Sequence, residues 1–168
     1  VSKDIIKEAV AFFKGTKRRQ EEIGNTSGGA LVIDDYAHHP VEIKATLATA
    51  KSIAEKRKSR VIAIFQPHRY SRVKDLFHDF TTCFSDSDKL YILDIYGAGE
   101  MPIDGITSRD LINEMVKLGA RPEFIARHED ISEIIRSEAH SGDLIVMMGA
   151  GSISSWAWQL PDKFANNS

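Results

Sequence analysis

Short apolar runs alternate with helix-like segments along most of this chain, and that alternation constrains the fold more than any other feature. Ala30–Ile33, Val61–Phe65 and Leu144–Met148 are continuous apolar runs of the kind found in buried strands. Between them, apolar residues recur at three- and four-residue spacing, which indicates helices. Strands that alternate with helices predict βαβ units, and therefore a parallel sheet covered by helices on both faces.

The predicted fold class is α/β, a Rossmann-like three-layer αβα sandwich of about six strands, mostly parallel with one antiparallel edge strand. The polar stretch Lys17–Glu22 is the candidate edge strand, and the turn residues Gly24–Gly29 separate it from the first buried strand. Leu90–Ile95 and Glu123–Ala126 are the remaining strand candidates.

Helices are predicted where apolar residues share one face. One is expected within Val1–Gly15, and another begins at Pro40, a residue favoured at the first position of a helix. Val73–Phe84 carries the next apolar face. Thr107–Asp110 resembles a capping box before a further helix, and Ser152–Phe164 is the last helix expected.

The length and composition of the chain fit one globular domain spanning residues 1–168. A formal net charge of -2 gives no basic field that would favour nucleic acid. The single Cys83 fits a reducing compartment, and no apolar run approaches the length of a membrane span, so we expect a cytoplasmic protein. No signal peptide is visible, and the absence of an initiator Met suggests an excised domain or a fragment.

Two polar clusters carry most of the functional information. Asp34–Pro40 (DDYAHHP) follows the first buried strand, and Gln66–Arg72 (QPHRYSR) follows the second. In an open α/β sheet the carboxyl ends of the strands face the ligand crevice. We therefore expect the carboxylates, histidines, arginines and tyrosines of both clusters to converge on one edge of the sheet.

The first cluster alone leaves several interpretations open. Adjacent carboxylates and histidines can ligate a metal, relay a proton or bind a polar ligand, but they can also be a solvated loop that caps a helix. One hypothesis is a metal-dependent hydrolase. Its candidate ligands are Asp34, Asp35, His38, His39 and His68. Another is a non-catalytic binding module on a Rossmann-like scaffold, which fold alone does not separate from an enzyme.

The second cluster favours an anionic ligand. Arg69 and Arg72 are three residues apart at a predicted helix start, and the guanidinium fork suits carboxylate or phosphate. Gly149–Gly151 also follows a strand, but we interpret it as a tight strand-to-helix turn rather than a phosphate site. No G-x-x-x-x-G-K-[ST] motif occurs in the chain, so the usual cradle for the phosphates of ATP is missing.

Five segments in order resemble the C-terminal domain of the Mur ligases. They are Lys17–Glu21, Asp34–Pro40, Phe65–Arg72, Ala98–Ile103 and Gly149–Ile153. Within that family, the segment His68–Arg72 fits the branch that joins L-alanine to UDP-N-acetylmuramate. The competing branch, which attaches a whole tripeptide to the same nucleotide, shares an Asp-Asp-x-Ala-His-His-Pro cluster but needs a more open pocket.

The resemblance implies an ATP-dependent ligase of peptidoglycan precursor synthesis. The family phosphorylates the carboxyl of UDP-N-acetylmuramate, and the amine of the amino acid then attacks the acyl phosphate. ATP and Mg²⁺ are held mainly by a central ATPase domain, which this chain lacks, as it lacks the N-terminal uridine-nucleotide domain. The resemblance therefore implies a domain that is inactive alone. From the net charge and the lack of a long apolar run we also expect no nucleic-acid partner and no membrane insertion.

The resemblance also assigns residues. The expected L-alanine pocket consists of Tyr36, His38, His68, Arg69 and Arg72. Asp35 matches an acidic residue near the nucleotide ribose, and Arg19 matches a nucleotide-phosphate contact. His38 and His68 are candidate proton acceptors for the amine, and sequence does not decide between them. No metal ligand is assigned in this chain.

Overall fold

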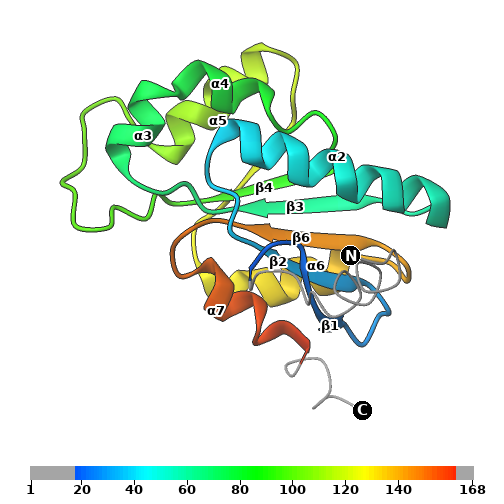
Figure 1. Ribbon diagram of the computed structural model, residues 1–168. Helices are drawn as coiled ribbons and strands as arrows, with labels where there is room; N and C mark the ends of the chain where they lie inside the picture. Colours follow the sequence, from blue (N-terminus) through cyan, green and yellow to red (C-terminus); the bar gives the residue numbers. More distant parts are fainter. Residues whose placement is uncertain (1–17, 162–168) are drawn as a thin grey trace, which may run out of the picture.

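Six strands form one sheet at the centre of the molecule, in the order β1-β2-β6-β3-β4-β5 (Figure 1). The computed structural model describes residues 18–161. The strands are β1 (Glu21–Asn25), β2 (Leu31–Asp35), β3 (Val61–Phe65), β4 (Lys89–Leu93), β5 (Glu123–Ile125) and β6 (Leu144–Met148). Only β1 is antiparallel to its neighbour within the described residues. The predicted αβα sandwich with one antiparallel edge strand is therefore confirmed.

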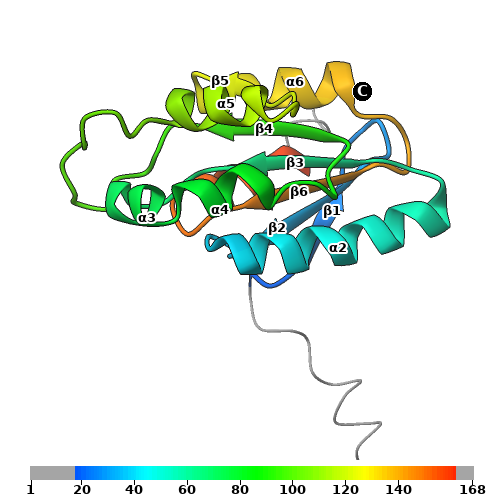
Figure 2. The ribbon, with the colours of Figure 1, turned by 90° about the horizontal axis from the view of Figure 1, so that it is seen from above.

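Helices cover both faces of the sheet. On one face lie α2 (Pro40–Arg57), α3 (Tyr70–Asp75), α4 (Phe77–Thr82) and α5 (Ser108–Lys117). On the other lie α6 (Ile131–Glu138), preceded by the short helix η1 (His128–Asp130), and α7 (Ile153–Ala157). Seen from above, α2 runs along the side of the sheet near β6 and β3, whereas α5 lies near β4 and β5 (Figure 2).

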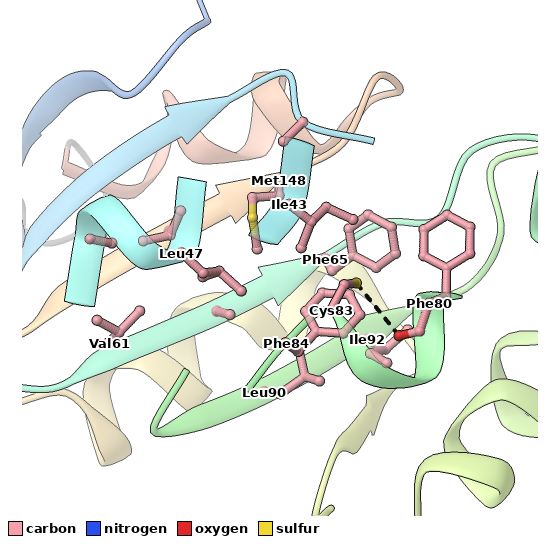
Figure 3. Packing of buried hydrophobic residues seen from close by; sticks show 14 of the residues in the cluster. Ile43, Leu47, Val61, Phe65, Phe80, Cys83, Phe84, Leu90, Ile92 and Met148 are labelled. Atoms are coloured by element: carbon pink, nitrogen blue, oxygen red, sulfur yellow. Dashed lines mark hydrogen bonds between the residues drawn. The ribbon is translucent and has the colours of Figure 1, made fainter. Parts of the chain in front are cut away.

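The central strands are buried on both faces, and their alternate residues build two apolar cores. Phe65 packs towards α4 with ring centroids 5.7 Å from Phe80 and 5.2 Å from Phe84 (Figure 3). Ile62 and Ile64 point the other way, into the core beneath α6 and α7. Burial of β3 and β6 along their whole length explains why their sequences are continuous apolar runs rather than alternating ones.

Cap chemistry fixes two helix starts as predicted. Pro40 is the first residue of α2, and the Glu42 carboxylate accepts hydrogen bonds from the backbone amides of His38 and His39, each at 3.2 Å. Thr107 caps α5: its side chain accepts from the Asp110 amide, and Asp110 accepts in return from the Thr107 amide at 3.0 Å. The predicted capping box is therefore confirmed.

Several predicted boundaries were wrong. The helix predicted over Val73–Phe84 is two short helices, because the backbone leaves helical geometry at Leu76. The edge strand begins at Glu21 and continues to Asn25, so the turn after it is shorter than expected. The helix predicted within Val1–Gly15 lies outside the described residues, as does the end of the last one. Across residues 18–161, no helix combines the length and the apolar character needed to cross a membrane.

Candidate functional site

The two polar clusters meet at the carboxyl edge of the sheet. Asp34–Pro40 spans the end of β2 and Gln66–Arg72 follows β3, with β6 between the two strands. Beyond β3 and β4, His68 pairs with Tyr96, and the Tyr96 amide donates to the Pro67 carbonyl at 2.8 Å. The pairing of these two segments continues past the strands and brings Tyr96, at the start of the glycine-rich segment Tyr96–Glu100, to the edge.

Aromatic side chains form a row along this edge. The rings of Tyr36 and His38 meet edge to face, with centroids 4.9 Å apart. The ring of His38 lies 6.0 Å from that of His68, which in turn stacks on Tyr96 at 5.6 Å. The structure thus brings together the predicted residues Tyr36, His38 and His68, from both clusters.

The hydrogen bonds of the two histidines differ, and they fix different tautomers. His38 Nδ1 lies 2.8 Å from the Tyr36 carbonyl oxygen, which can only accept, so Nδ1 carries the hydrogen. His68 Nδ1 lies 3.1 Å from Arg72 Nη1, which can only donate, so Nδ1 is the acceptor. In the neutral rings, His38 therefore has a free lone pair on Nε2, whereas the His68 Nε2 carries a hydrogen.

Burial and nearby positive charge both favour the neutral form of the His68 ring. Partial burial lowers the pKa of His68 below its ordinary value, and the positive charge of Arg72 lowers it further, with smaller contributions from His38 and Arg69. Arg72 Nη1 also donates to the His68 carbonyl at 3.1 Å. Arg72 therefore orients His68 and, together with burial, favours the neutral ring whose Nε2 can donate a hydrogen bond.

Arg69 presents its guanidinium to solvent beside these rings. Its side chain is 51% exposed, and its Nη1 lies 4.0 Å from Oε1 of Glu100, a long distance for an ion pair. The backbone of Arg69 has φ of 69°, a conformation that costs a residue with a side chain on the order of 1–3 kcal/mol. Such strain is common at binding sites.

The adjacent carboxylates of the first cluster separate onto opposite faces of the sheet. β2 continues through Asp35, so alternate residues point to opposite sides. Asp34 is fully buried towards α7 and accepts a short hydrogen bond from Ser154. Burial raises the pKa of the Asp34 carboxyl, partly offset by Ser154 and by the charge of Arg18. The expectation that both carboxylates converge on one site was therefore wrong for Asp34.

Asp35 lies on the α2 side, where it lines a cleft of about 370 Å³ with Arg19, Tyr36 and Glu42. Its two oxygens accept from the backbone amides of Ala37 at 2.7 Å and Gln20 at 2.8 Å. The predicted nucleotide contacts Asp35 and Arg19 thus share one cleft. Their role in nucleotide binding stays a prediction, and the two amide bonds show that Asp35 also fixes the local backbone.

Arg18 is an important residue that the sequence reasoning missed. Its Nη2 donates to the Gly149 carbonyl at 2.8 Å, and its Nε lies 3.7 Å from Asp34 Oδ2. Its guanidinium also lies over the ring of Tyr36, 4.8 Å from the centroid. Arg18 therefore ties β2, the end of β6 and Tyr36 together. Nothing in the run Lys17–Arg19 distinguishes it from its cationic neighbours.

Close packing explains the glycines after β6. A Cβ on Gly149 would lie 2.8 Å from the Gln66 backbone oxygen, and one on Gly151 would lie 2.8 Å from both Gln66 Oε1 and the Tyr96 ring. The Gln66 side chain also accepts from the Ile153 amide at 3.1 Å. The interpretation of a tight strand-to-helix turn agrees with this packing.

The geometry does not favour the metal-hydrolase hypothesis. Asp34 is directed to the α7 face, whereas Asp35 lines the cleft on the α2 side and His38 lies 3.7 Å from Glu42 of α2. Among residues 18–161, no group of three histidine, cysteine, aspartate or glutamate side chains is arranged to hold a metal ion. The carboxyl edge of the sheet instead carries the exposed guanidinium of Arg69 and two histidines, His38 and His68, with opposite hydrogen-bonding roles.

Comparison with known proteins identifies similar sequences over most of the chain. Residues 18–151 match the family described as Mur ligase, glutamate ligase domain. A UDP-N-acetylmuramate–L-alanine ligase from Rickettsia felis is 54% identical over 163 residues, which is 96% of this chain and 34% of that protein. The chain thus spans about a third of the length of the curated relatives it matches.

Solved structures give the same picture of the fold. The UDP-N-acetylmuramate–alanine ligase of Thermotoga maritima matches 96% of this chain and 33% of its own chain, with a TM-score of 0.74 and 24% identity. A murein peptide ligase from Psychrobacter arcticus matches 96% of this chain and 32% of its own, with a TM-score of 0.71 and 25% identity.

Proposed function

The chain belongs to the Mur ligase family, as a glutamate ligase domain, and from that premise we propose that it is the C-terminal domain of the ligase that joins L-alanine to UDP-N-acetylmuramate. The reaction is an ATP-dependent amide formation through an acyl phosphate. The observation that carries this proposal is the exposed Arg69 fork beside His38 and His68, which suits a small zwitterionic amino acid. The curated relatives that are 53–54% identical to this chain are named UDP-N-acetylmuramate–L-alanine ligases, which favours alanine over a peptide.

We propose that Arg69 binds the carboxylate of alanine by charge-assisted hydrogen bonds. Arg72 acts beside it, through His68, whose orientation it fixes. Tyr36 and Tyr96 supply the walls of the pocket at the two ends of the aromatic row. Holding the amine in a fixed position against the acyl phosphate is the main contribution expected of these residues.

The two histidines take different roles in this proposal. An ammonium group must lose a proton before it can attack, and only His38 has an available lone pair, on Nε2. His68 offers a hydrogen on Nε2, which suits an oxygen that gains negative charge as the amide forms. We therefore assign proton acceptance to His38 and hydrogen-bond donation to His68.

We propose that Mg²⁺ and most of the ATP are bound by another part of a longer protein. The sequence has no P-loop, and only Asp35 and Arg19 are proposed as contacts to the nucleotide, to its ribose and phosphate. Closure of the domains would exclude water, which otherwise hydrolyses an acyl phosphate. We also propose a cytoplasmic location, which suits the unpaired Cys83 thiol.

The proposed function predicts activity in the longer protein and none in this chain alone. With ATP, Mg²⁺ and UDP-N-acetylmuramate, the longer protein should incorporate labelled L-alanine into the nucleotide, with phosphate release that depends on alanine. The 168-residue chain should give no incorporation under the same conditions, because it has no P-loop to hold ATP. Efficient turnover by this chain alone would contradict the proposed division of labour. Incorporation of a peptide but not of alanine by the longer protein would contradict the assigned substrate.

The histidine assignment predicts two different tautomers in this chain. In ¹⁵N NMR spectra near neutral pH, His38 should show a bare Nε2 and His68 a protonated Nε2. Replacing Arg72 by alanine should raise the pKa of His68, because a nearby positive charge is removed. The same tautomer at both rings, or a pKa of His68 that Arg72→Ala leaves unchanged, would contradict the assignment.

A further inference from the structure

The loop between β4 and α5 folds back onto the start of α3, beside the proposed amino-acid pocket. The Arg69 amide donates to the Tyr96 carbonyl at 2.8 Å, next to the point where His68 and Tyr96 pair. At Gly97 a Cβ would lie 3.0 Å from the Glu100 carbonyl oxygen and 3.1 Å from the ring of Tyr70. The loop and the helix start are therefore in close contact.

Glu100, from this loop, supplies the acceptor that the start of α3 lacks. Arg69 stands at the cap position of α3 and has no acceptor in its side chain. The Glu100 carboxylate accepts from the Ser71 amide at 2.9 Å and from the Ser71 hydroxyl at 2.7 Å. These two bonds join residues 29 positions apart in the sequence. They hold the loop against Ser71, two residues after Arg69.

We propose that Glu100 is a positioning residue for the Arg69 fork, an inference that rests on the proposed function. Glu100 fixes the backbone just after Arg69, and its Oε1 lies 4.0 Å from Arg69 Nη1. At that distance the carboxylate attracts the guanidinium without occupying its hydrogen bonds. Arg69 is thus held in one direction while its donors stay available to the carboxylate of the amino acid.

The backbone conformation of Arg69 and the expected kinetic effect separate this role from that of an ordinary helix cap. Arg69 keeps a left-handed backbone, with φ of 69°, which persists only where neighbouring contacts hold it in place. Loss of an ordinary cap would loosen a six-residue helix and affect all three substrates alike, whereas loss of a positioning residue affects the binding of one substrate among three. The discriminating measurement is therefore the Michaelis constant of each substrate.

The test uses the longer ligase that contains this chain, with Glu100→Ala and Glu100→Gln. We expect Glu100→Ala to raise KM for L-alanine about 10-fold and to leave KM for ATP and UDP-N-acetylmuramate within about 2-fold. Gln keeps one acceptor oxygen for the Ser71 amide but no charge. Glu100→Gln should therefore recover any thermal stability of the domain that Glu100→Ala loses, while its KM for alanine stays about 5-fold above that of the wild type.

Glu114→Ala is the matched control, because Glu114 pairs with Lys117 on the exposed side of α5 and should leave all three Michaelis constants unchanged. If the wild-type ligase uses alanine and Glu100→Ala leaves its KM unchanged, the role of Glu100 is overturned and the proposed function stands. Equal increases in all three Michaelis constants would also overturn it, in favour of a purely structural cap. If the wild-type ligase does not use alanine, the proposed function itself fails.

Discussion

Replacing Arg69 by alanine is expected to lower kcat/KM for L-alanine about 100-fold in the longer ligase, mainly through KM. A hydrogen bond to a charged group contributes about 1.5–3 kcal/mol, and a 100-fold change corresponds to about 2.7 kcal/mol. Arg69 has the exposure and the free donors to make that contribution, because its nearest carboxylate stands 4.0 Å away. Steady-state kinetics with alanine as the varied substrate measure the effect.

L-Alaninamide makes this test specific for the carboxylate. The wild-type enzyme should discriminate strongly against the amide, and Arg69→Ala should lose most of that discrimination, because the interaction removed is the one with the carboxylate. Arg69→Lys keeps the charge but not the planar fork, so we expect about a 10-fold loss. Arg57→Ala, in the exposed last turn of α2, should have no effect. An Arg69→Ala enzyme within about 3-fold of the wild type would contradict the assignment.

The layers of the fold and the edge that carries the site could be predicted because they depend on local patterns. Continuous apolar runs marked both ends of β3 and β6 correctly, and the order of strands and helices implied a parallel sheet. Once the sheet is parallel, its carboxyl ends share an edge. His38 and His68, 30 positions apart, could therefore be expected as neighbours from the sequence alone.

The placement of Asp34 and Asp35 on opposite faces of the sheet could not be predicted, because it depends on where strand β2 ends. The apolar run stops at Ile33, but pairing with β6 continues to Asp35, which lies opposite Met148. Two more residues of strand send neighbouring side chains to opposite faces. Apolar pattern alone does not reveal such an extension, since the backbone pairing does not depend on the side chain.

Long-range contacts of the loops were also beyond the sequence. Arg18 contacts Gly149, 131 residues away, and Glu100 contacts Ser71 across 29 residues. Helix periodicity likewise missed the break at Leu76, because the apolar spacing continues from Val73 to Phe80 although α4 starts afresh. In each case the missing information is the path of the backbone between regular elements, which hydrophobic pattern does not encode.

The second large effect is expected on stability, at the edge of the sheet opposite the site. Asp143, 3% exposed, precedes β6 and accepts hydrogen bonds from the amides of Arg60 and His140 and from the Arg60 guanidinium. Asp143→Ala should lower the free energy of unfolding by about 3 kcal/mol, the lower end for breaking a buried pair, because Arg60 is partly exposed and recovers some hydration. The corresponding fall in melting temperature is roughly 6–12 °C.

Two variants separate the buried network from a general effect of losing a carboxylate. Asp143→Asn keeps the size and one acceptor oxygen, so about half of the loss should be recovered. Asp104→Ala removes an exposed loop carboxylate and should change the free energy of unfolding by less than about 0.5 kcal/mol. Chemical denaturation of this chain, with circular dichroism as the signal, measures all three.

The effect of Asp143 should depend on pH in a defined direction. Burial alone would raise the pKa of the Asp143 carboxyl, but the hydrogen bonds from Arg60 and His140 outweigh burial and lower it below its ordinary value. A carboxyl whose pKa is lower in the folded state stabilises the fold above its unfolded pKa of about 3.9, and that stabilisation is lost as the pH falls through the folded pKa. The difference between wild type and Asp143→Ala should therefore be constant from pH 7 to about pH 5 and shrink below about pH 4. A difference that stays the same at pH 3, or that grows as the pH falls, would show that the ionised carboxylate is not what holds Arg60 and His140 together.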